Sequence, residues 1–382
     1  MKIAFDSWVL SSRLRHQGTY VYARNLIAEF KKLARTDPEL SFCLFHSPRA
    51  ANDANTIAPD GNFELSPSWW LSRDRLWRLG GASLAASREQ ADLIFSPTSN
   101  ILPLGAVPVV SAVHDVTPRV LPTHSRKVNL MQRFMLRSAC KFSRAIITGS
   151  ECSKRDMINF YGVPEGKISV VPYGFDETIF NDRAPDVERR NALQKRFGLT
   201  KPYVWHHGVI QPRKNLVRLI EAYRLMLSRS RNLEFDLVLA GPLGWEYQEI
   251  VASAADGAGQ GGRVVLTGPL DDDDLVCLLK GATLVIVPSL YEGFCLPMVE
   301  AMACGVACVA ADASCLPEVS GGVLKYFDPR SVDDMASCMK SVLDSDGCRR
   351  GLAERGKKRS AAYSWRRCAD ETLQVLRKHS RA

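Results

Sequence analysis

The sequence lacks the features that define several protein classes. None of its apolar runs approaches the roughly 20 residues that a membrane-spanning helix needs. The N-terminus MKIAFDSWVL passes from Lys2 directly into a strand pattern instead of a secretory signal. Its eleven cysteines have no CxxC pair and no regular spacing, so we expect all of them to be reduced thiols. These absences predict a protein of the cytoplasm.

A dinucleotide fingerprint and nucleic-acid motifs are also absent. No GxGxxG follows the first strand, which argues against an NAD enzyme. The net charge of +9 is concentrated in the first half, where residues 1–175 hold 22 Lys plus Arg against 14 Asp plus Glu. Such a basic half can face nucleic acid, an anionic membrane surface or a phosphorylated substrate. Without a nucleic-acid motif, we expect no nucleic-acid partner.

What the sequence has in abundance is a regular alternation of short apolar runs and amphipathic helical stretches. Twelve runs have the character of buried strands, at 2–8, 42–47, 92–98, 107–115, 144–150, 168–174, 203–209, 235–242, 263–269, 282–289, 305–312 and 323–328. This alternation predicts an α/β protein with two doubly wound parallel sheets. Structure-breaking Pro172 and Gly174 place the boundary between residues 1–175 and 176–364. A ligand is expected beside the carboxyl ends of the strands, in a cleft between the domains.

The stretch YEGFCLPMVEAMACG contains two carboxylates, Glu292 and Glu300. A proline and a glycine predict a helix from Met298 to Cys304, so that Glu292 lies in the preceding turn and Glu300 in the first turns. The backbone N–H groups between them are expected to face the ligand; they belong to Phe294, Cys295 and Leu296. Two carboxylates beside a helix N-terminus suit a ligand that has both hydroxyls and phosphates.

A basic pair, Arg213 and Lys214, lies between a strand and a helix in the segment HHGVIQPRKNLVRLIEAY. Arginine offers a bidentate fork and lysine a point charge, which together suit a diphosphate. The alternative is a solvated helix start, but positive charge there opposes the helix dipole. A bound anion would offset this small unfavourable interaction, so the pair favours an anionic ligand.

Two positions in the first half are candidates on weaker grounds. His114 leaves a strand toward the expected cleft and can exchange a proton near neutral pH, although a lone histidine is more often structural. Gly18 opens a helix and lets the backbone approach an anion. A plain connection between strand and helix explains Gly18 equally well.

Two further segments have competing interpretations. The run Asp271 to Asp274 precedes an apolar helix, where carboxylates cap free N–H groups, and we favour capping over a metal site. The stretch WWLSRDRLWRLGG, residues 69–81, mixes tryptophan with arginine. It suits a membrane interface or a lipid diphosphate, but equally a helix with tryptophan in the core and arginine in water.

Taken together, these motifs and their order make the chain resemble the family four retaining glycosyltransferases, which have the GT-B fold of two Rossmann-like domains facing across a cleft. EGFCLPMVE matches the Glu-x7-Glu motif of that family and QPRKN its basic phosphate motif. SECSKRDMI and VVPYGFDETIF match the segment that leads to the interdomain linker. GTYVYARNLI and VHDVTP fall where the family has its glycine loop and active-site histidine.

The resemblance implies roles for the candidate residues. Glu300 would hold the donor ribose, and Glu292 a hydroxyl of the transferred sugar. Arg213 and Lys214 would bind the diphosphate, while His114 would contact the sugar. The turn from Phe294 to Leu296 would bind sugar and phosphate through its backbone. Gly18 and Thr19 would approach the donor phosphates from the other domain, and the helix at 365–382 would pack back on the first domain.

Several residues depart from the family pattern, at Gln17, Val209 and Cys295, so that donor preference does not transfer directly. Glycosidases place two carboxylates across the scissile bond. Here both glutamates belong to one turn and the helix that follows it. We therefore expect them to bind the donor by accepting hydrogen bonds from its hydroxyls, and not to act across a scissile bond. The resemblance implies a retaining transfer that requires neither metal nor cofactor.

The most concrete expectation is a mannosyltransferase that uses GDP-mannose in lipopolysaccharide or exopolysaccharide synthesis. Its acceptor would be a saccharide or a lipid-linked saccharide, and it would act in the cytoplasm, with peripheral contact at the inner face of the plasma membrane. The alternatives are a sugar-nucleotide epimerase and a non-catalytic sugar-binding protein of the same fold.

Overall fold

The computed structural model describes residues 1–10, 18–46, 61–67, 76–122, 124–230, 233–256 and 261–381. The chain divides into two compact units. The first consists of Met1–Gly174 together with Trp365–Ala382, and the second of Phe175–Ser364. The sequence placed the boundary after residue 175, one position beyond this division.

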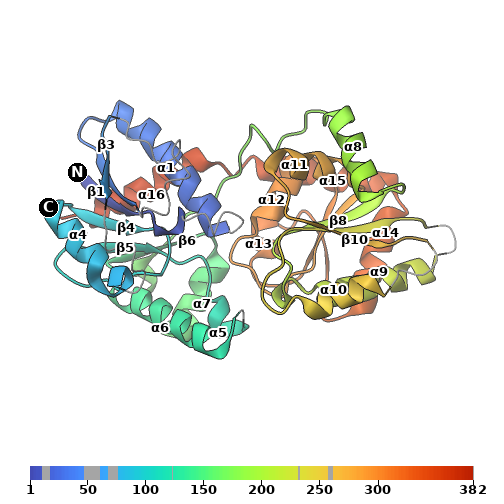
Figure 1. The fold of residues 1–382 in the computed structure, drawn as a ribbon, viewed down its shortest axis with the longest axis horizontal. Helices are drawn as coiled ribbons and strands as arrows, with labels where there is room; N and C mark the ends of the chain where they lie inside the picture. Colours follow the sequence, from blue (N-terminus) through green and yellow to red (C-terminus); the bar gives the residue numbers. More distant parts are fainter. Residues whose placement is uncertain are drawn as a thin grey trace. The chain divides into compact units, whose positions relative to one another are not determined.

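The first unit is built on a seven-stranded sheet with the order β3-β2-β1-β4-β5-β6-β7 (Figure 1). All neighbouring strands are parallel. The strands are β1 Lys2–Asp6, β2 Ser41–His46, β3 Phe63–Pro67, β4 Leu93–Ser96, β5 Val109–Ala112, β6 Ala145–Thr148 and β7 Ile168–Val170. The sequence predicted six of them and missed β3. This edge strand contains a glutamate, a serine and a proline, so it has no continuous apolar run to mark it.

Helices cover this sheet because their apolar faces pack on the strands. They are α1 Gly18–Thr36, α4 Ala82–Arg88, α5 Thr117–Val120, α6 Arg126–Phe142, α7 Glu151–Tyr161 and, from the end of the chain, α16 Trp365–His379. A short π-helical segment, Trp77–Gly81, leads into α4. The core between α1 and the sheet includes Phe5, which packs edge-on against Phe95 with the ring centroids 5.4 Å apart.

The second unit holds a six-stranded parallel sheet with the order β10-β9-β8-β11-β12-β13. All six predicted strands are confirmed, as β8 Tyr203–His207, β9 Asp236–Ala240, β10 Val264–Gly268, β11 Leu284–Val287, β12 Cys308–Ala311 and β13 Lys325–Phe327. Its helices are α8 Val187–Phe197, α9 Leu216–Ser228, α10 Gln248–Ala255, α11 Asp272–Gly281, α12 Leu296–Ala303, α13 Leu316–Ser320, α14 Val332–Leu343 and α15 Asp346–Ser360. Helix α8 lies in the segment that the sequence marked only as a charged connection.

Helix α16 crosses back to the first unit and packs on α1, β4 and β6. Its first residue, Trp365, stacks on Tyr173 with the ring planes 15° apart, and Tyr22 lies edge-on to the same indole. The cysteines are all free thiols, and all but Cys348 are buried. Among the described residues, no helix combines the length and apolar character that crossing a bilayer requires.

Candidate active site

The strand order of the second unit reverses between β8 and β11, which pair directly. In doubly wound sheets, ligands bind at the carboxyl ends of the two strands that flank such a reversal. The chain that leaves β8 turns at Gly208 and forms a short 3-10 helix, Pro212–Lys214. The chain that leaves β11 leads to Tyr291 and Glu292. The two candidate motifs therefore emerge at the same edge of the sheet.

A buried ion triad joins these two connections. One oxygen of Glu292 lies 2.7 Å from the Arg213 guanidinium, and the other accepts a hydrogen bond of 2.7 Å from the Lys214 ammonium. Arg213 also donates to the backbone carbonyl of Tyr291, at 2.7 Å. Glu292 and Lys214 each keep only 6% of their surface exposed. Three charged side chains from two loops are thus held in a fixed arrangement.

The ionisation of Glu292 follows from this arrangement. Burial alone would raise the pKa of its carboxyl, but the adjacent Arg213 and Lys214 outweigh burial and hold the pKa well below its usual range. The carboxylate is therefore ionised at neutral pH, and the triad carries a net charge of +1. This is the sign that binding an anionic group at this edge requires.

The second carboxylate, Glu300 on α12, is oriented from β8. The indole N–H of Trp205 donates to His207 Nδ1 at 3.0 Å, so the hydrogen of the neutral imidazole lies on Nε2. That nitrogen lies 3.0 Å from Glu300 Oε2 and donates to it. A chain of two hydrogen bonds thereby fixes the carboxylate.

A second histidine at the end of β8 has a free acceptor. His206 donates from Nδ1 to the carbonyl of Ile286, at 3.1 Å. Its Nε2 is buried and has no hydrogen-bond partner within the described part of the chain. Burial, with the nearby Lys214 charge, lowers the pKa of His206 to about 3, so this ring is neutral.

The turn before α12 contains a strained residue. Cys295 has φ +74°, a left-handed conformation that a side chain other than glycine rarely adopts. Burial raises the pKa of its thiol to about 12, so the thiol stays protonated. Phe294, Cys295 and Leu296 are all buried. Helix α12 begins at Leu296 and ends at Ala303, earlier at both ends than the predicted Met298 to Cys304.

The candidates of the first unit lie at the carboxyl end of its own sheet. His114 follows β5, accepts from the Tyr173 hydroxyl at Nδ1 (2.6 Å) and donates from Nε2 to the Pro97 carbonyl (2.8 Å). Burial lowers its pKa, and the ring is neutral. Both nitrogens are engaged within the unit, so a sugar contact through either one requires the release of a partner. Gly18 and Thr19 form the first turn of α1.

The acidic run forms a cap, as the sequence favoured. The Asp271 side chain accepts from the backbone N–H of Asp274 at the start of α11. Arg189 of α8 donates to the carboxylates of Asp271, Asp273 and Asp274. The cluster therefore ties α8 to α11. No grouping of metal-ligating side chains is found among the residues that the structure describes.

The structure describes only part of the tryptophan-rich stretch, residues 69–81. Residues 69–75 lie outside the described residues. Trp77 is fully buried and donates its indole N–H to Asp6, and the Arg78 guanidinium lies 4.2 Å from the centre of the Trp8 ring. Trp77 therefore follows the alternative of a tryptophan in the core.

Neither histidine of the segment HHG was among the site residues predicted from the sequence. The signal was available, because both residues stand at the end of a buried strand and directly precede the glycine of the turn. What the sequence alone does not reveal is the partner of each ring, because Glu300 lies 93 residues from His207.

Most of the chain is similar in sequence to known glycosyltransferases. Two family models match, Glycosyltransferase Family 4 over residues 17–179 and Glycosyl transferases group 1 over residues 188–359. The O-antigen chain mannosyltransferase B of Escherichia coli is 29% identical over 294 residues, which are 76% of each chain. The serotype-specific mannosyltransferase WbdA of the same organism is 29% identical over 269 residues, which are 69% of this chain and 33% of that protein.

Two solved structures illustrate the likeness in fold. Anabaena Alr3699/HepE in complex with UDP and glucose has a TM-score of 0.74 at 20% identity, with 99% of this chain and 100% of that chain covered. WaaG, a glycosyltransferase involved in lipopolysaccharide biosynthesis, has a TM-score of 0.68 at 13% identity, with 98% and 99% covered.

Proposed function

Since the chain is a glycosyltransferase with a family 4 domain and a group 1 domain, and has the GT-B fold, we propose that it transfers mannose from GDP-mannose with retention. The acceptor is a saccharide or a lipid-linked saccharide of lipopolysaccharide or exopolysaccharide synthesis. The choice of mannose is supported by the similarity to the O-antigen chain mannosyltransferase B over three quarters of both chains.

The observation that carries the mechanism is the buried triad at the strand reversal. A departing nucleoside diphosphate gains negative charge, and fixed cations in a desolvated site stabilise such charge without reorganising. Arg213 and Lys214 supply these cations, and Glu292 holds both in place. In this proposal they stabilise the leaving group, while the Glu292 carboxylate also accepts from a hydroxyl of the transferred sugar.

The remaining site residues orient the donor. Glu300, fixed by His207 at one oxygen, accepts from the donor ribose at the other. The backbone of the turn from Phe294 to Leu296 binds sugar and phosphate at the start of α12. His114, Gly18 and Thr19 contribute from the first unit, where His114 contacts the sugar after one of its present hydrogen bonds is released. Because the cations already offset the leaving charge, we propose that transfer requires neither divalent metal nor cofactor.

A thermal-shift panel tests the donor. Ligands that bind only the folded state raise the unfolding temperature. We expect GDP-mannose to raise it more than UDP-glucose, dTDP-glucose or ADP-glucose at the same concentration. A larger shift with a uridine sugar would overturn the GDP assignment and leave the transferase class intact. Glu354→Gln, an exposed carboxylate on α15, serves as the control variant and should retain the same ranking.

Two assays separate the rival functions. With the donor alone, an epimerase converts GDP-mannose into an isomeric nucleotide sugar, whereas a transferase without acceptor leaves it unchanged or hydrolyses it slowly. With donor and acceptor, a non-catalytic binding protein forms no product. If the wild type forms product and Glu292→Ala forms none but still binds GDP, the hypothesis of a non-catalytic binding protein is excluded.

A further inference from the structure

Helix α6 and its flanking strands contain no acidic residue. From Val116 to Ser150 the sequence has neither Asp nor Glu. The same segment has seven basic residues, all exposed: Arg119, Arg126, Lys127, Arg133, Arg137, Lys141 and Arg144. None of them forms an ion pair with a carboxylate within the described ranges. This segment accounts for most of the +8 excess of the first half of the chain.

The same region exposes large apolar side chains. Across the described residues, thirteen large hydrophobic side chains are exposed, and seven of them lie on α5, α6 and α7, which pack side by side. These seven are Val120, Val128, Leu130, Met131, Phe134, Phe142 and Phe160. Leu130 is 68% exposed and Phe134 52%. Scattered exposed hydrophobics are ordinary on a monomer, but clustering over neighbouring helices is characteristic of an interaction surface.

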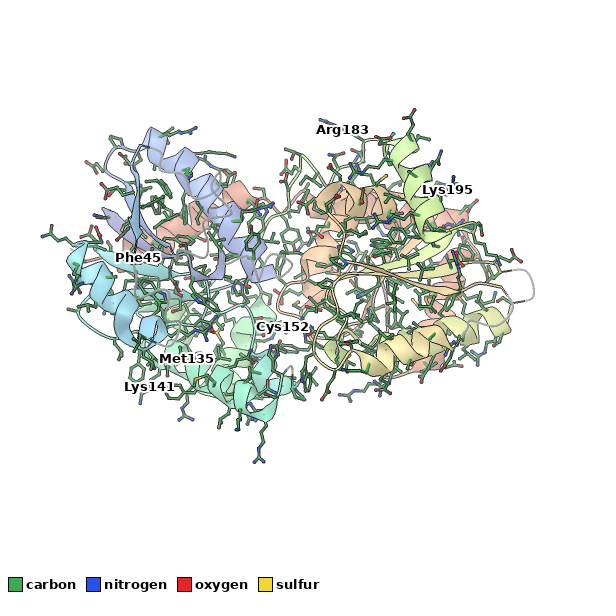
Figure 2. All side chains as sticks on the ribbon, in the orientation of Figure 1. Phe45, Met135, Lys141, Cys152, Arg183 and Lys195 are labelled. Carbon is green, nitrogen blue, oxygen red and sulfur yellow. The ribbon has the colours of Figure 1, made fainter. Side chains whose placement is uncertain are left out.

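The two kinds of side chain share the outer side of α6. Leu130 and Phe134 are four residues apart and therefore neighbours on the helix surface, and Arg133 and Arg137 have the same spacing beside them. Met135, Leu136 and Ala139 are buried, whereas Lys141 is exposed. Figure 2 labels Met135 and Lys141 on this helix. At the carboxyl end of the helix, Lys167 donates to the carbonyls of Cys140 and Lys141 and anchors it. The outer residues thus stand on a fixed helix.

We propose that this α6 face, made of the seven basic and seven apolar residues, docks on an anionic lipid bilayer. Apolar side chains on a helix that lies in the membrane plane enter the boundary of the acyl chains, while Lys and Arg contact anionic headgroups. The segment from Val116 to Ser150 carries only positive charges, which complement a uniformly negative surface. On the neighbouring α7, Glu151 lies 3.8 Å from the Lys154 ammonium, which offsets its charge. The proposal rests on the proposed function for its lipid-linked acceptor. It places the membrane contact that was expected from the sequence at α6 and not at the Trp77 segment.

Sedimentation with sucrose-loaded vesicles tests the docking. We expect the wild-type protein to bind vesicles of phosphatidylglycerol and phosphatidylcholine, and to bind phosphatidylcholine alone at least tenfold more weakly. Each Lys or Arg near a membrane surface contributes about fivefold in affinity, so Arg133→Ala with Arg137→Ala should lower binding about 25-fold. Leu130→Ser with Phe134→Ser should lower it at least about tenfold.

A matched control comes from α8 of the other unit. Val187 is 54% exposed and Lys195 is exposed on the same helix (Figure 2). Val187→Ser with Lys195→Ala removes one apolar and one basic side chain there and should leave vesicle binding unchanged. Because all substituted residues are exposed, the unfolding temperature of every variant should stay near that of the wild type.

Several outcomes would overturn the proposal. The first is that both α6 variants bind anionic vesicles as tightly as the wild type does. The second is that the wild type binds neutral and anionic vesicles equally. The third is that the wild type binds no vesicles but forms a dimer in solution, which Leu130→Ser with Phe134→Ser dissociates. The proposed function is tested separately, because transfer to a water-soluble saccharide acceptor should be equal in the wild type and the α6 variants. If transfer fails with every donor while anionic vesicles still bind, the docking stands and the transfer proposal falls.

Discussion

The two compact units share one kind of sheet but place their charges differently. In the second unit, charged groups at the strand ends are buried and paired, with Glu292 between Arg213 and Lys214. In the first unit, the strand-end residues His114 and Asp6 form their hydrogen bonds with neutral groups, and the basic excess lies on the outer side of α6. Burying charge is costly unless geometry compensates, so it is expected where a fixed arrangement has a chemical purpose. Exposed charge acts at longer range and orients a whole domain.

Each unit also holds a neutral histidine near the carboxyl ends of its strands, His114 in the first and His206 in the second, and their hydrogen bonds differ. Both nitrogens of His114 are partnered. His206 has one partnered nitrogen and one without a partner among the described residues, beside Lys214. The site of the second unit is thus preformed and incompletely satisfied, as expected of a binding site before its ligand arrives.

The largest expected effect comes from removing the charge at the centre of the triad. Glu292→Gln leaves Arg213 and Lys214 buried with a neutral partner. Breaking a buried ion pair from one side costs about 3 to 5 kcal/mol, and we expect the free energy of unfolding to fall by about 3 kcal/mol. Transfer should fall about 100-fold, because the cations lose their position. Urea unfolding and product formation measure the two effects.

The matched control is Glu354→Gln, which changes an exposed carboxylate of the same unit and should alter neither quantity. If Glu292→Gln changed stability and transfer as little as this control does, the triad would be no more important to either than an exposed carboxylate.

A smaller effect is expected from the residue that orients Glu300. His207→Leu removes the donor to the carboxylate and should raise the donor KM about tenfold. His207→Gln restores an N–H at that position and should bring KM back near the wild-type value. His207→Leu also leaves the Trp205 indole without its acceptor and should lose about 1 to 2 kcal/mol of stability. Equal KM in the two variants would show that His207 supports the fold alone.

The pH dependence of stability sharpens the comparison of the histidines. His206 has a folded pKa of about 3, below the unfolded value near 6.5, so the unfolded state binds more protons as pH falls through 6.5. Its contribution is complete above pH 6.5 and decreases below it, by about 2 kcal/mol at pH 5. His114 is shifted in the same direction by burial, so its contribution also decreases below pH 6.5.

His206→Asn keeps a donor to the Ile286 carbonyl and removes the titration. We expect this variant to lose less stability than the wild type between pH 7.5 and pH 5, as measured by urea midpoints at each pH. An unchanged pH dependence would assign the effect to other groups.

The smallest effect is expected at the acidic run. Asp271→Ala removes a helix cap and one carboxylate from Arg189, and should cost about 1 kcal/mol of stability. Transfer should stay at the wild-type rate, with or without EDTA. Asp272→Ala, which removes an acidic side chain of the same first turn, should cost only a few tenths of a kcal/mol. A loss of transfer on chelation would favour a metal at this edge after all.

The sequence was most informative about the buried strands. Twelve strands could be predicted because parallel strands covered on both faces are continuous apolar runs. The edge strand β3 could not be predicted, because Glu64 and Ser66 interrupt its apolar residues. Likewise α8 was missed because its only buried residue is Leu193, so its apolar face is too narrow to show a helical period.

For the site, the residue types predicted an anionic ligand, but they did not predict that Glu292 forms ion pairs with Arg213 and Lys214. Their mutual ion pairs depend on which two strands are neighbours, and strand order is a property of the folded sheet. The hydrogen bond from His207 to Glu300 has the same origin. The roles of these residues in binding and transfer stay predictions that the experiments above address.

The return of α16 to the first unit has a practical consequence for engineering. Because residues 365–382 belong with residues 1–174, the second unit is topologically an insertion between two parts of the first. A fragment that ends at Gly174 would leave Tyr22 and Tyr173 without the Trp365 indole that covers them. A chimera that exchanges the second unit should therefore replace the interior of the gene between two junctions and keep the native C-terminal helix.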